Sequence, residues 1–108
     1  MLRKIEAFLT PSKLEPLREL LLKRGIEGMS VLQAQGWGTR SKIKNGKPQF
    51  EDRVKVEIVL DEDLVDPLIQ GIQELAGAGT LGSGKIFVIP VEDAVRLSTR
   101  ESGKSAVV

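Results

Sequence analysis

Two stretches with helical spacing of apolar residues each follow a strand-like stretch, and this alternation constrains the fold more than any other feature of the chain. Residues 2–9 alternate and then run apolar, which is typical of a strand. Pro11 marks a helix start, and leucines at positions 14, 17, 21 and 22 follow at helical spacing. Basic residues and Gly25 then favour the end of this helix. The start of the chain therefore predicts a strand followed by a helix.

The rest of the chain repeats this order with one additional strand. Strands are predicted over about 29–37 and about 53–60. In the second of these stretches, apolar and polar residues alternate. Three acids at 61–63 favour a helix N-terminus, because they complement the helix dipole. Apolar residues then recur at spacings of one, three and four over 64–75, and the glycines of 77–79 end this second helix.

A final strand over Lys85–Val91 completes the order strand, helix, strand, strand, helix, strand. That order predicts an α+β fold, a ferredoxin-like βαββαβ sandwich in which two helices cover one face of an antiparallel sheet. A length of 108 residues suits one such domain, so residues 1–108 are predicted to form a single unit. Neighbouring apolar residues such as Val31 and Leu32 put apolar side chains on both faces of the sheet. An apolar face without helices predicts self-association.

The balance of charges and the missing residue types exclude several classes of function. Sixteen basic and fifteen acidic residues give a net charge of +1, so no overall field attracts nucleic acid, and no nucleic-acid partner is expected. Neither cysteine nor histidine is present, which excludes thiol and imidazole catalysis and the commonest zinc sites. No apolar run approaches the roughly 20 residues of a membrane span, and the first residues alternate unlike a signal peptide. A cytoplasmic location is therefore expected.

A glycine-rich run over residues 79–85 has the composition of a phosphate-binding turn. It fits the pattern Gly-x-x-x-x-Gly-Lys, but Ile86 stands where a P-loop has Ser or Thr, and a strand follows where a helix should begin. A nucleoside-triphosphatase is therefore not expected. Glycines let successive backbone N–H groups converge on an anion, and Lys85 adds a positive charge. The alternative is an ordinary glycine-rich connection between a helix and a strand.

The segment from about 38 to 52 is far longer than an ordinary hairpin loop. It contains two apolar residues, Ile43 and Phe50, which we expect to be exposed. One interpretation is a hairpin tip with its own turn at Asn45 and Gly46. The other is a recognition arm that docks on a partner. Its four basic residues are Arg40, Lys42, Lys44 and Lys47.

Five blocks in this order resemble the PII signal-transduction family over essentially the whole chain. The blocks are Arg3-Lys4-Ile5-Glu6-Ala7 with Pro11, Gly25 to Val31, Gly36-Trp37-Gly38, Val54 to Val59, and Gly82 to Val88. The resemblance implies a ferredoxin-like homotrimer that binds adenine nucleotides between subunits. It also implies that the protein regulates a membrane transporter or a metabolic enzyme through the long arm, which is called the T-loop in that family.

The resemblance also implies a role for individual residues. The run 79–85 corresponds to the B-loop, in which Gly82, Gly84 and Lys85 hold phosphates, and a C-terminal loop over about 92–108 brings Arg96 from the neighbouring subunit. Ser30 and the backbone near Val59 read adenine. The predicted nucleotide site, with no catalytic and no metal-binding residue, is Ser30, Gly36, Trp37, Gly38, Arg40, Arg53, Glu57, Val59, Gly82, Ser83, Gly84, Lys85, Arg96, Ser98 and Arg100.

Departures from the family pattern change the expected mechanism. Classical members use a glutamine and a lysine to bind magnesium and 2-oxoglutarate beside ATP, and this chain has Arg40 and Arg53 at those positions. A guanidinium cannot coordinate a cation, which argues against a 2-oxoglutarate response and leaves magnesium open. Ser98 replaces the second arginine of a C-terminal pair, for which Arg100 is a candidate substitute. The arm is also shorter than the classical T-loop, so the chain resembles a divergent member.

The resulting expectation is a sensor that binds ATP, ADP or AMP without metal. The two arginines at the cleft mouth leave an alternative open, a sensor of a small anion such as bicarbonate together with a nucleotide. An enzyme of the same fold, a small phosphatase, is disfavoured because the only asparagine, Asn45, lies in the arm. An RNA-binding module is disfavoured because only Trp37 and Phe87 are candidates for stacking on bases.

Overall fold

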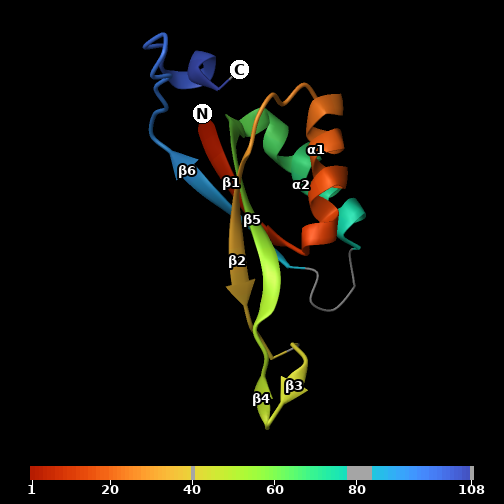
Figure 1. Cartoon of the computed structure of the whole chain (residues 1–108). Coiled ribbons are helices and arrows are strands. Elements are labelled where there is room, and N and C mark those ends of the chain that lie inside the picture. The colour runs from red at the N-terminus through yellow and green to blue at the C-terminus, as the bar shows by residue number, and fades with distance from the viewer. Residues whose placement is uncertain (40, 78–83, 108) are drawn as a thin grey trace.

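The computed structural model describes residues 1–39, 41–77 and 84–107, and it confirms the predicted fold. One antiparallel sheet has the strand order β2-β5-β1-β6, and Figure 1 shows both long helices on the same side of it. The strands of this sheet are β1 (Leu2–Leu9), β2 (Ser30–Gly36), β5 (Glu51–Asp61) and β6 (Lys85–Val91). The helices are α1 (Leu14–Lys23) and α2 (Val65–Ala76), with short 3-10 turns at Pro11–Lys13, Glu62–Leu64 and Gly103–Ala106.

Local sequence signals set the ends of both helices. Before α2, the Asp61 carboxylate accepts a hydrogen bond from the Asp63 backbone N–H at 3.3 Å, which satisfies one free donor at the N-terminus. Gly25 after α1 has φ of 72° and Gly77 after α2 has φ of 81°, the left-handed conformation that glycine adopts at helix ends. The predicted helix ends are therefore confirmed by their backbone geometry.

The core lies between the helices and one face of the sheet. Ile5 of β1, Ile58 of β5 and Leu68 of α2 are almost completely buried, and burying such a side chain stabilises the fold by about 1.5–3 kcal/mol. Because β1 and β5 pair antiparallel with Ile5 opposite Ile58, their inward residues form a continuous apolar stripe. The buried cluster is Ile5, Ala7, Leu9, Leu17, Leu21, Ile26, Val54, Val56, Ile58, Leu60, Val65, Leu68 and Ile72.

The opposite face of the sheet, here called the open face, differs from the expected apolar surface. Apolar side chains are present at its edges, where Leu32 of β2 and Phe87 of β6 are each 47% exposed. Phe87 meets Phe8 edge-on, with ring centroids 6.3 Å apart. The centre of the face instead has two lysines and two glutamates in mutual contact, Lys4, Glu6, Lys55 and Glu57.

The segment between β2 and β5 contains a small hairpin of its own. Strands β3 (Ile43–Lys44) and β4 (Lys47–Pro48) pair antiparallel across Asn45 and Gly46, whose φ angles are 53° and 76°. Two positive φ angles define a type I′ turn, as the Asn-Gly pair predicts. Figure 1 shows this hairpin at the far end of the molecule, whose longest extent is 52 Å. Strand β5 begins at Glu51, so the arm ends earlier than residue 52.

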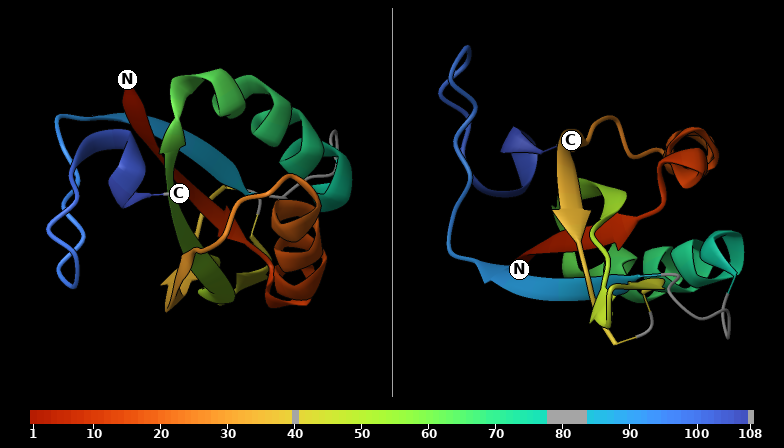
Figure 2. Two further views of the ribbon diagram at one scale, coloured as in Figure 1. Left: turned by 90° about the horizontal axis from the view of Figure 1, so that it is seen from above. Right: turned by 60° about the horizontal axis from the view of Figure 1, so that its bottom comes forward.

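The end of the chain lies apart from the helices. Figure 2 shows the segment after β6 on the side of the sheet away from α1 and α2. This segment folds back on itself through the bridge between Val95 and Ser102. In the described part of the chain, neither helix has the length and apolar character needed to cross a bilayer.

Candidate functional site

A hollow of about 330 Å³ lies on the open face, near the end of the sheet opposite the arm. Three residues of the predicted nucleotide site meet here: Ser30 from β2, and Glu57 and Val59 from β5. Ser30 and Glu57 are cross-strand partners, and Val59 lies two residues further along β5 on the same face. The hollow is also lined by Lys4, Gly28, Met29 and Val107.

The lysine and glutamate side chains at the centre of the open face form a network, here called the charged quartet. The Lys4 Nζ lies 3.2 Å from carboxylate oxygens of both Glu6 and Glu57. The Lys55 Nζ lies 3.2 Å from Glu6 and 3.6 Å from Glu57. Glu6 and Glu57 are direct partners across β1 and β5, so each lysine offsets the repulsion between two carboxylates.

The contacts within the charged quartet shift the pKa values of Glu6 and Lys4 toward their ionised forms. Hydrogen bonds from Lys4, and then from Lys55, lower the pKa of the Glu6 carboxyl below its ordinary value, although partial desolvation opposes them. Hydrogen bonds to Glu6 and then Glu57 raise the pKa of Lys4. Glu57 therefore faces the hollow beside an ammonium group, and a carboxylate there can accept a hydrogen bond from a ligand hydroxyl or amino group. Sequence reasoning missed Lys4, because its contact with Glu57 depends on strand pairing across more than fifty positions.

The glycine-rich run is described only at its end. Gly82 and Ser83 lie outside the described residues, and so does Arg40. Gly84 has φ of 109°, and a Cβ on it would lie 1.9 Å from the Phe8 carbonyl oxygen. A glycine is therefore required at this position by close packing against β1. The next residue, Lys85, is the cross-strand partner of Phe8.

The arm end of the sheet holds a second group of predicted residues. Gly36 lies opposite Glu51 at the end of β2, Trp37 is 60% exposed, and the Gly38 backbone N–H donates to the Ser41 hydroxyl at 2.9 Å. Lys85 begins β6 at this same end. Phe8 lies four positions beyond Lys4 in β1, which corresponds to about 14 Å along a strand. The predicted site thus divides into two groups at opposite ends of one sheet.

Arg53 is bound within the base of the arm. Its guanidinium donates to the Glu51 carboxylate at 2.8 Å and to the Asp52 carbonyl oxygen at 2.8 Å. The other oxygen of Glu51 accepts from the Lys42 backbone N–H at 3.2 Å. The contact with Arg53, and then the one with Lys42, lower the pKa of Glu51. Glu51, which sequence reasoning did not select, therefore connects the arm to β5.

The C-terminal arginine and its neighbours lie in the folded-back segment after β6. The Arg96 backbone N–H donates to the Glu101 carbonyl oxygen at 2.7 Å, and its side chain lies 3.8 Å from the Glu101 carboxylate. Arg100 has φ of 65° in the turn, and the side chain of Leu97 beside Ser98 is 94% exposed. Within one protomer, this segment does not place Arg96 in the lining of the hollow, although Val107 further along the chain does reach it.

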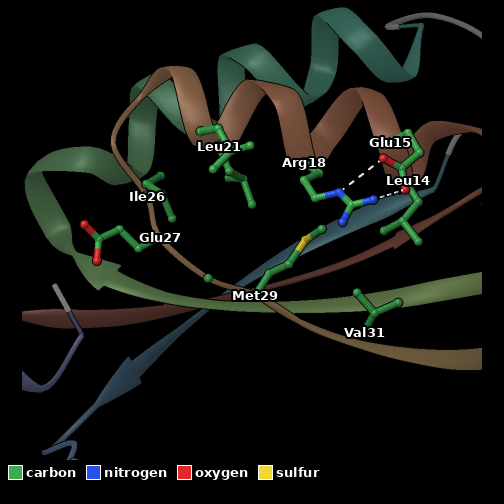
Figure 3. Close-up of a pocket in the computed structure, with 10 residues that line it drawn as sticks. Leu14, Glu15, Arg18, Leu21, Ile26, Glu27, Met29 and Val31 are labelled. Carbon is green, nitrogen blue, oxygen red and sulfur yellow. Dashed lines mark hydrogen bonds and ion pairs between the residues drawn. The ribbon is translucent and has the colours of Figure 1, made fainter.

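A different hollow, of about 300 Å³, lies on the helix side between α1 and β2. Figure 3 shows Leu21, Met29 and Val31 along its walls, and Arg18 bound to Glu15 on α1. Its walls are mainly apolar, and none of the predicted nucleotide-binding residues that the structure describes lines it. The described residues also include no group of three acidic side chains placed to hold a metal ion. The open face therefore remains the candidate site.

The structure is a ferredoxin-like α+β domain with a hollow on its open face and a projecting arm, and comparison with known proteins identifies its family. The family model described as Nitrogen regulatory protein P-II matches residues 2–101. The chain therefore belongs to the P-II family of nitrogen regulatory proteins. These are signalling proteins and not enzymes, which removes the small phosphatase as an alternative.

Individual relatives match over almost the whole chain. Nitrogen regulatory protein P-II of Azospirillum brasilense is 39% identical and that of Bradyrhizobium diazoefficiens is 38% identical, each covering 98% of this chain and 100% of the relative. The solved structure of Arabidopsis thaliana PII bound to citrate is similar with a TM-score of 0.83 and 37% identity, covering 98% of this chain and 89% of that one. The fold and the family expected from the sequence are thus confirmed.

Proposed function

We propose that the protein is a homotrimeric sensor that binds an adenine nucleotide between subunits and regulates a membrane transporter or a metabolic enzyme through its arm. The single observation that supports this proposal is the division of the predicted site into two groups at opposite ends of the sheet. Ser30, Glu57 and Val59 lie near the chain termini, whereas Gly84 and Lys85 lie near the arm. Two adjacent protomers can complete a site that one protomer leaves divided.

The two groups suit different parts of a nucleotide. The hollow beside Glu57 offers a carboxylate acceptor, a serine hydroxyl and an apolar wall, which suit an adenosine moiety. Gly84 keeps the backbone close to β1 at the other end, and Lys85 supplies a cation for phosphate. In this proposal, Arg96 reaches the phosphates from the neighbouring subunit, as the family resemblance implies.

Nucleotide binding is proposed to need no metal ion. Arg53 is already bound to Glu51, and a guanidinium cannot act as a metal ligand. Phosphate bound near Lys85 would lie at the same end of the sheet as Gly36 and Gly38, which lead into the arm. Nucleotide contacts can therefore order or release the arm and so change its affinity for a partner. The cytoplasm, where adenine nucleotides are abundant, is the compartment in which such a sensor would act.

Intersubunit complementation tests the divided site. Glu57→Ala removes the group near the termini, Lys85→Ala removes the group near the arm, and each homotrimer is expected to lose ATP binding in calorimetry. Mixed trimers from coexpression would contain some interfaces with both groups intact, so partial binding returns. Binding that fails to return in mixed trimers, or a wild-type monomer in light scattering, would contradict the shared site. Repeating the wild-type titrations of ATP, ADP and AMP without magnesium tests metal independence.

A small carboxylate or bicarbonate is a second candidate ligand. The observation that favours it is that Arg53 binds a carboxylate, that of Glu51, at 2.8 Å. An Arabidopsis relative was solved bound to citrate, which is itself a carboxylate. Titration of bicarbonate, citrate and 2-oxoglutarate, each with and without ATP, distinguishes the candidates. A response that Arg53→Lys weakens favours a ligand at this position, whereas no heat with any of the three anions rejects it.

A further inference from the structure

The arm has a charge opposite to that of the rest of the chain. Between the end of β2 and the start of β5, the arm comprises residues 37–50, which include four basic residues and no acidic one, so its charge is +4. The whole chain has a net charge of +1, and the remainder therefore has a charge of −3. Such separation of charge steers association toward an oppositely charged surface.

The arm is already folded before it meets a partner. The type I′ turn at Asn45 and Gly46 closes the hairpin, and the Gln49 N–H donates to the Lys42 carbonyl oxygen at 2.8 Å. At the base, the Lys42 N–H donates to the Glu51 carboxylate, which Arg53 holds in place. A preformed binding element loses less conformational entropy on association than a disordered one.

The tip of this hairpin holds an uncompensated pair of like charges. Lys44 and Lys47 are direct cross-strand partners, and like charges at such positions destabilise a hairpin. Both residues are exposed, and among the residues the structure describes, no carboxylate lies within 4 Å of either ammonium group or of that of Lys42. The hairpin therefore tolerates an unfavourable pair that an external anion would relieve.

Apolar side chains accompany these cations. Ile43 next to Lys44 is 62% exposed, and Phe50 at the base of the hairpin is 65% exposed. Exposed aromatic and aliphatic side chains can act as the few anchors that fill pockets at protein interfaces. Phe50 lies at the base, and the tip from Ile43 to Pro48 has no aromatic side chain, which disfavours stacking of single-stranded nucleic acid on the tip itself. A membrane surface offers charge but no fixed shape to match a rigid hairpin.

We propose that the hairpin tip, residues 42–47, docks on a protein partner that presents a cluster of Asp or Glu carboxylates beside an apolar pocket for Ile43. This inference rests on the proposed function, in which the arm regulates a partner, and adds the chemistry of the surface that the partner presents. The pair Lys44 and Lys47 binds the carboxylates, and Ile43 supplies the apolar anchor.

Photo-crosslinking in the native host tests this proposal. A photoreactive amino acid at position 43 is expected to crosslink to a protein segment rich in Asp and Glu. Lys44→Glu with Lys47→Glu should reduce that crosslink at least about tenfold, since it places like charges across the contact. Replacing the crosslinked acids of the partner with lysine should then restore it.

A control double variant makes the same change in charge at a site away from the arm. Lys23 and Arg24 are adjacent, basic and exposed at the end of α1, so Lys23→Glu with Arg24→Glu should leave the crosslink unchanged. A crosslinked segment without acids, crosslinks to lipid or nucleic acid, equal loss in both double variants, or no crosslink at all would overturn the proposal. Calorimetry with ATP separates the proposed nucleotide sensor from the proposed docking of the hairpin tip. The double variant Lys44→Glu with Lys47→Glu should bind ATP as the wild type does. If the wild type itself does not bind ATP, only the nucleotide sensor is rejected.

Discussion

The two faces of the sheet are formed by the same strands but are stabilised by different interactions. Along β5, Ile58 points into the covered face and is 1% exposed, whereas its neighbour Glu57 points into the open face and contacts two lysines. The covered face is stabilised by the burial of apolar area, and the open face by mutual ion pairs that keep partial contact with solvent. Residues one position apart can therefore differ in whether they determine stability or binding.

The largest expected effect compares those two neighbours directly. Ile58→Ala removes a fully packed side chain and should lower the free energy of unfolding by about 2–5 kcal/mol in urea denaturation. It should leave the ATP affinity of the folded fraction unchanged. Glu57→Gln should do the opposite, with a small change in stability and a large loss of affinity in calorimetry. Similar losses of stability in both variants would show that the two faces are equally buried in solution.

The next effect concerns Gly84, which lies at the arm end of the sheet, just before β6. Gly84→Ala would force a Cβ toward the Phe8 carbonyl oxygen at a φ of 109°, which costs about 1–3 kcal/mol from the backbone conformation alone. The start of β6 should shift, and nuclear magnetic resonance should show changes at Lys85 and Phe8. Gly28→Ala is the matched control, because a Cβ there meets nothing within 4 Å. Equal stability of the two variants would contradict the close packing at Gly84.

A smaller effect appears in the dependence of stability on pH. Contact with Lys4, followed by Lys55, lowers the pKa of Glu6 in the folded state. Its contribution is therefore present above the pKa of an unfolded glutamate, about 4.3, and is lost as the pH falls through the lower folded value. The pKa of Lys4 is raised, so its contribution is lost only at strongly alkaline pH.

Urea denaturation at a series of acidic pH values measures this effect. The wild type should lose stability below about pH 4, and Glu6→Gln should show a flatter profile. Ile58→Ala provides the comparison from the covered face, because it should lower the whole profile without changing its slope. An unchanged slope in Glu6→Gln would show that Glu6 contributes nothing to the acid sensitivity.

The smallest effect is confined to the base of the arm. Glu51→Gln removes the charge that holds Arg53 and the Lys42 N–H, so hydrogen exchange at Lys42 and Gln49 should become faster. The amide protons of Ile58 and its neighbours in the core should exchange as in the wild type. Asp52→Asn, which replaces the carboxylate that accepts a hydrogen bond from Gln35, serves as the control. Slower or unchanged exchange at Lys42 would reject the role of Glu51 in holding the arm.

Local patterns predicted the order of strands and helices because they act over a few residues. The alternation of Val54, Val56 and Ile58, and the glycines at helix ends, needed no knowledge of distant segments. The family resemblance further led to the expectation that Ser30, Glu57 and Val59 lie together, and they do line one hollow. That these residues bind a nucleotide remains a prediction.

Pairings between distant segments were not predicted. Lys4 and Glu57 are 53 positions apart, and only the register of β1 against β5 brings them together. Arg53 and Glu51, by contrast, are only two positions apart, at the start of β5. Arg40, Gly82 and Ser83, which the sequence predicts as site residues, lie outside the described residues.

By itself, the sequence determined the class of fold, the ends of the helices and the turn of the arm, because propensity, capping and turn chemistry are local. Tertiary structure decided which charges meet on the open face and how the candidate site is divided between the two ends of the sheet. The physical reason is that ion pairs and hollows require a register between strands that are far apart in sequence. A shift of one residue in that register would move every side chain to the other face.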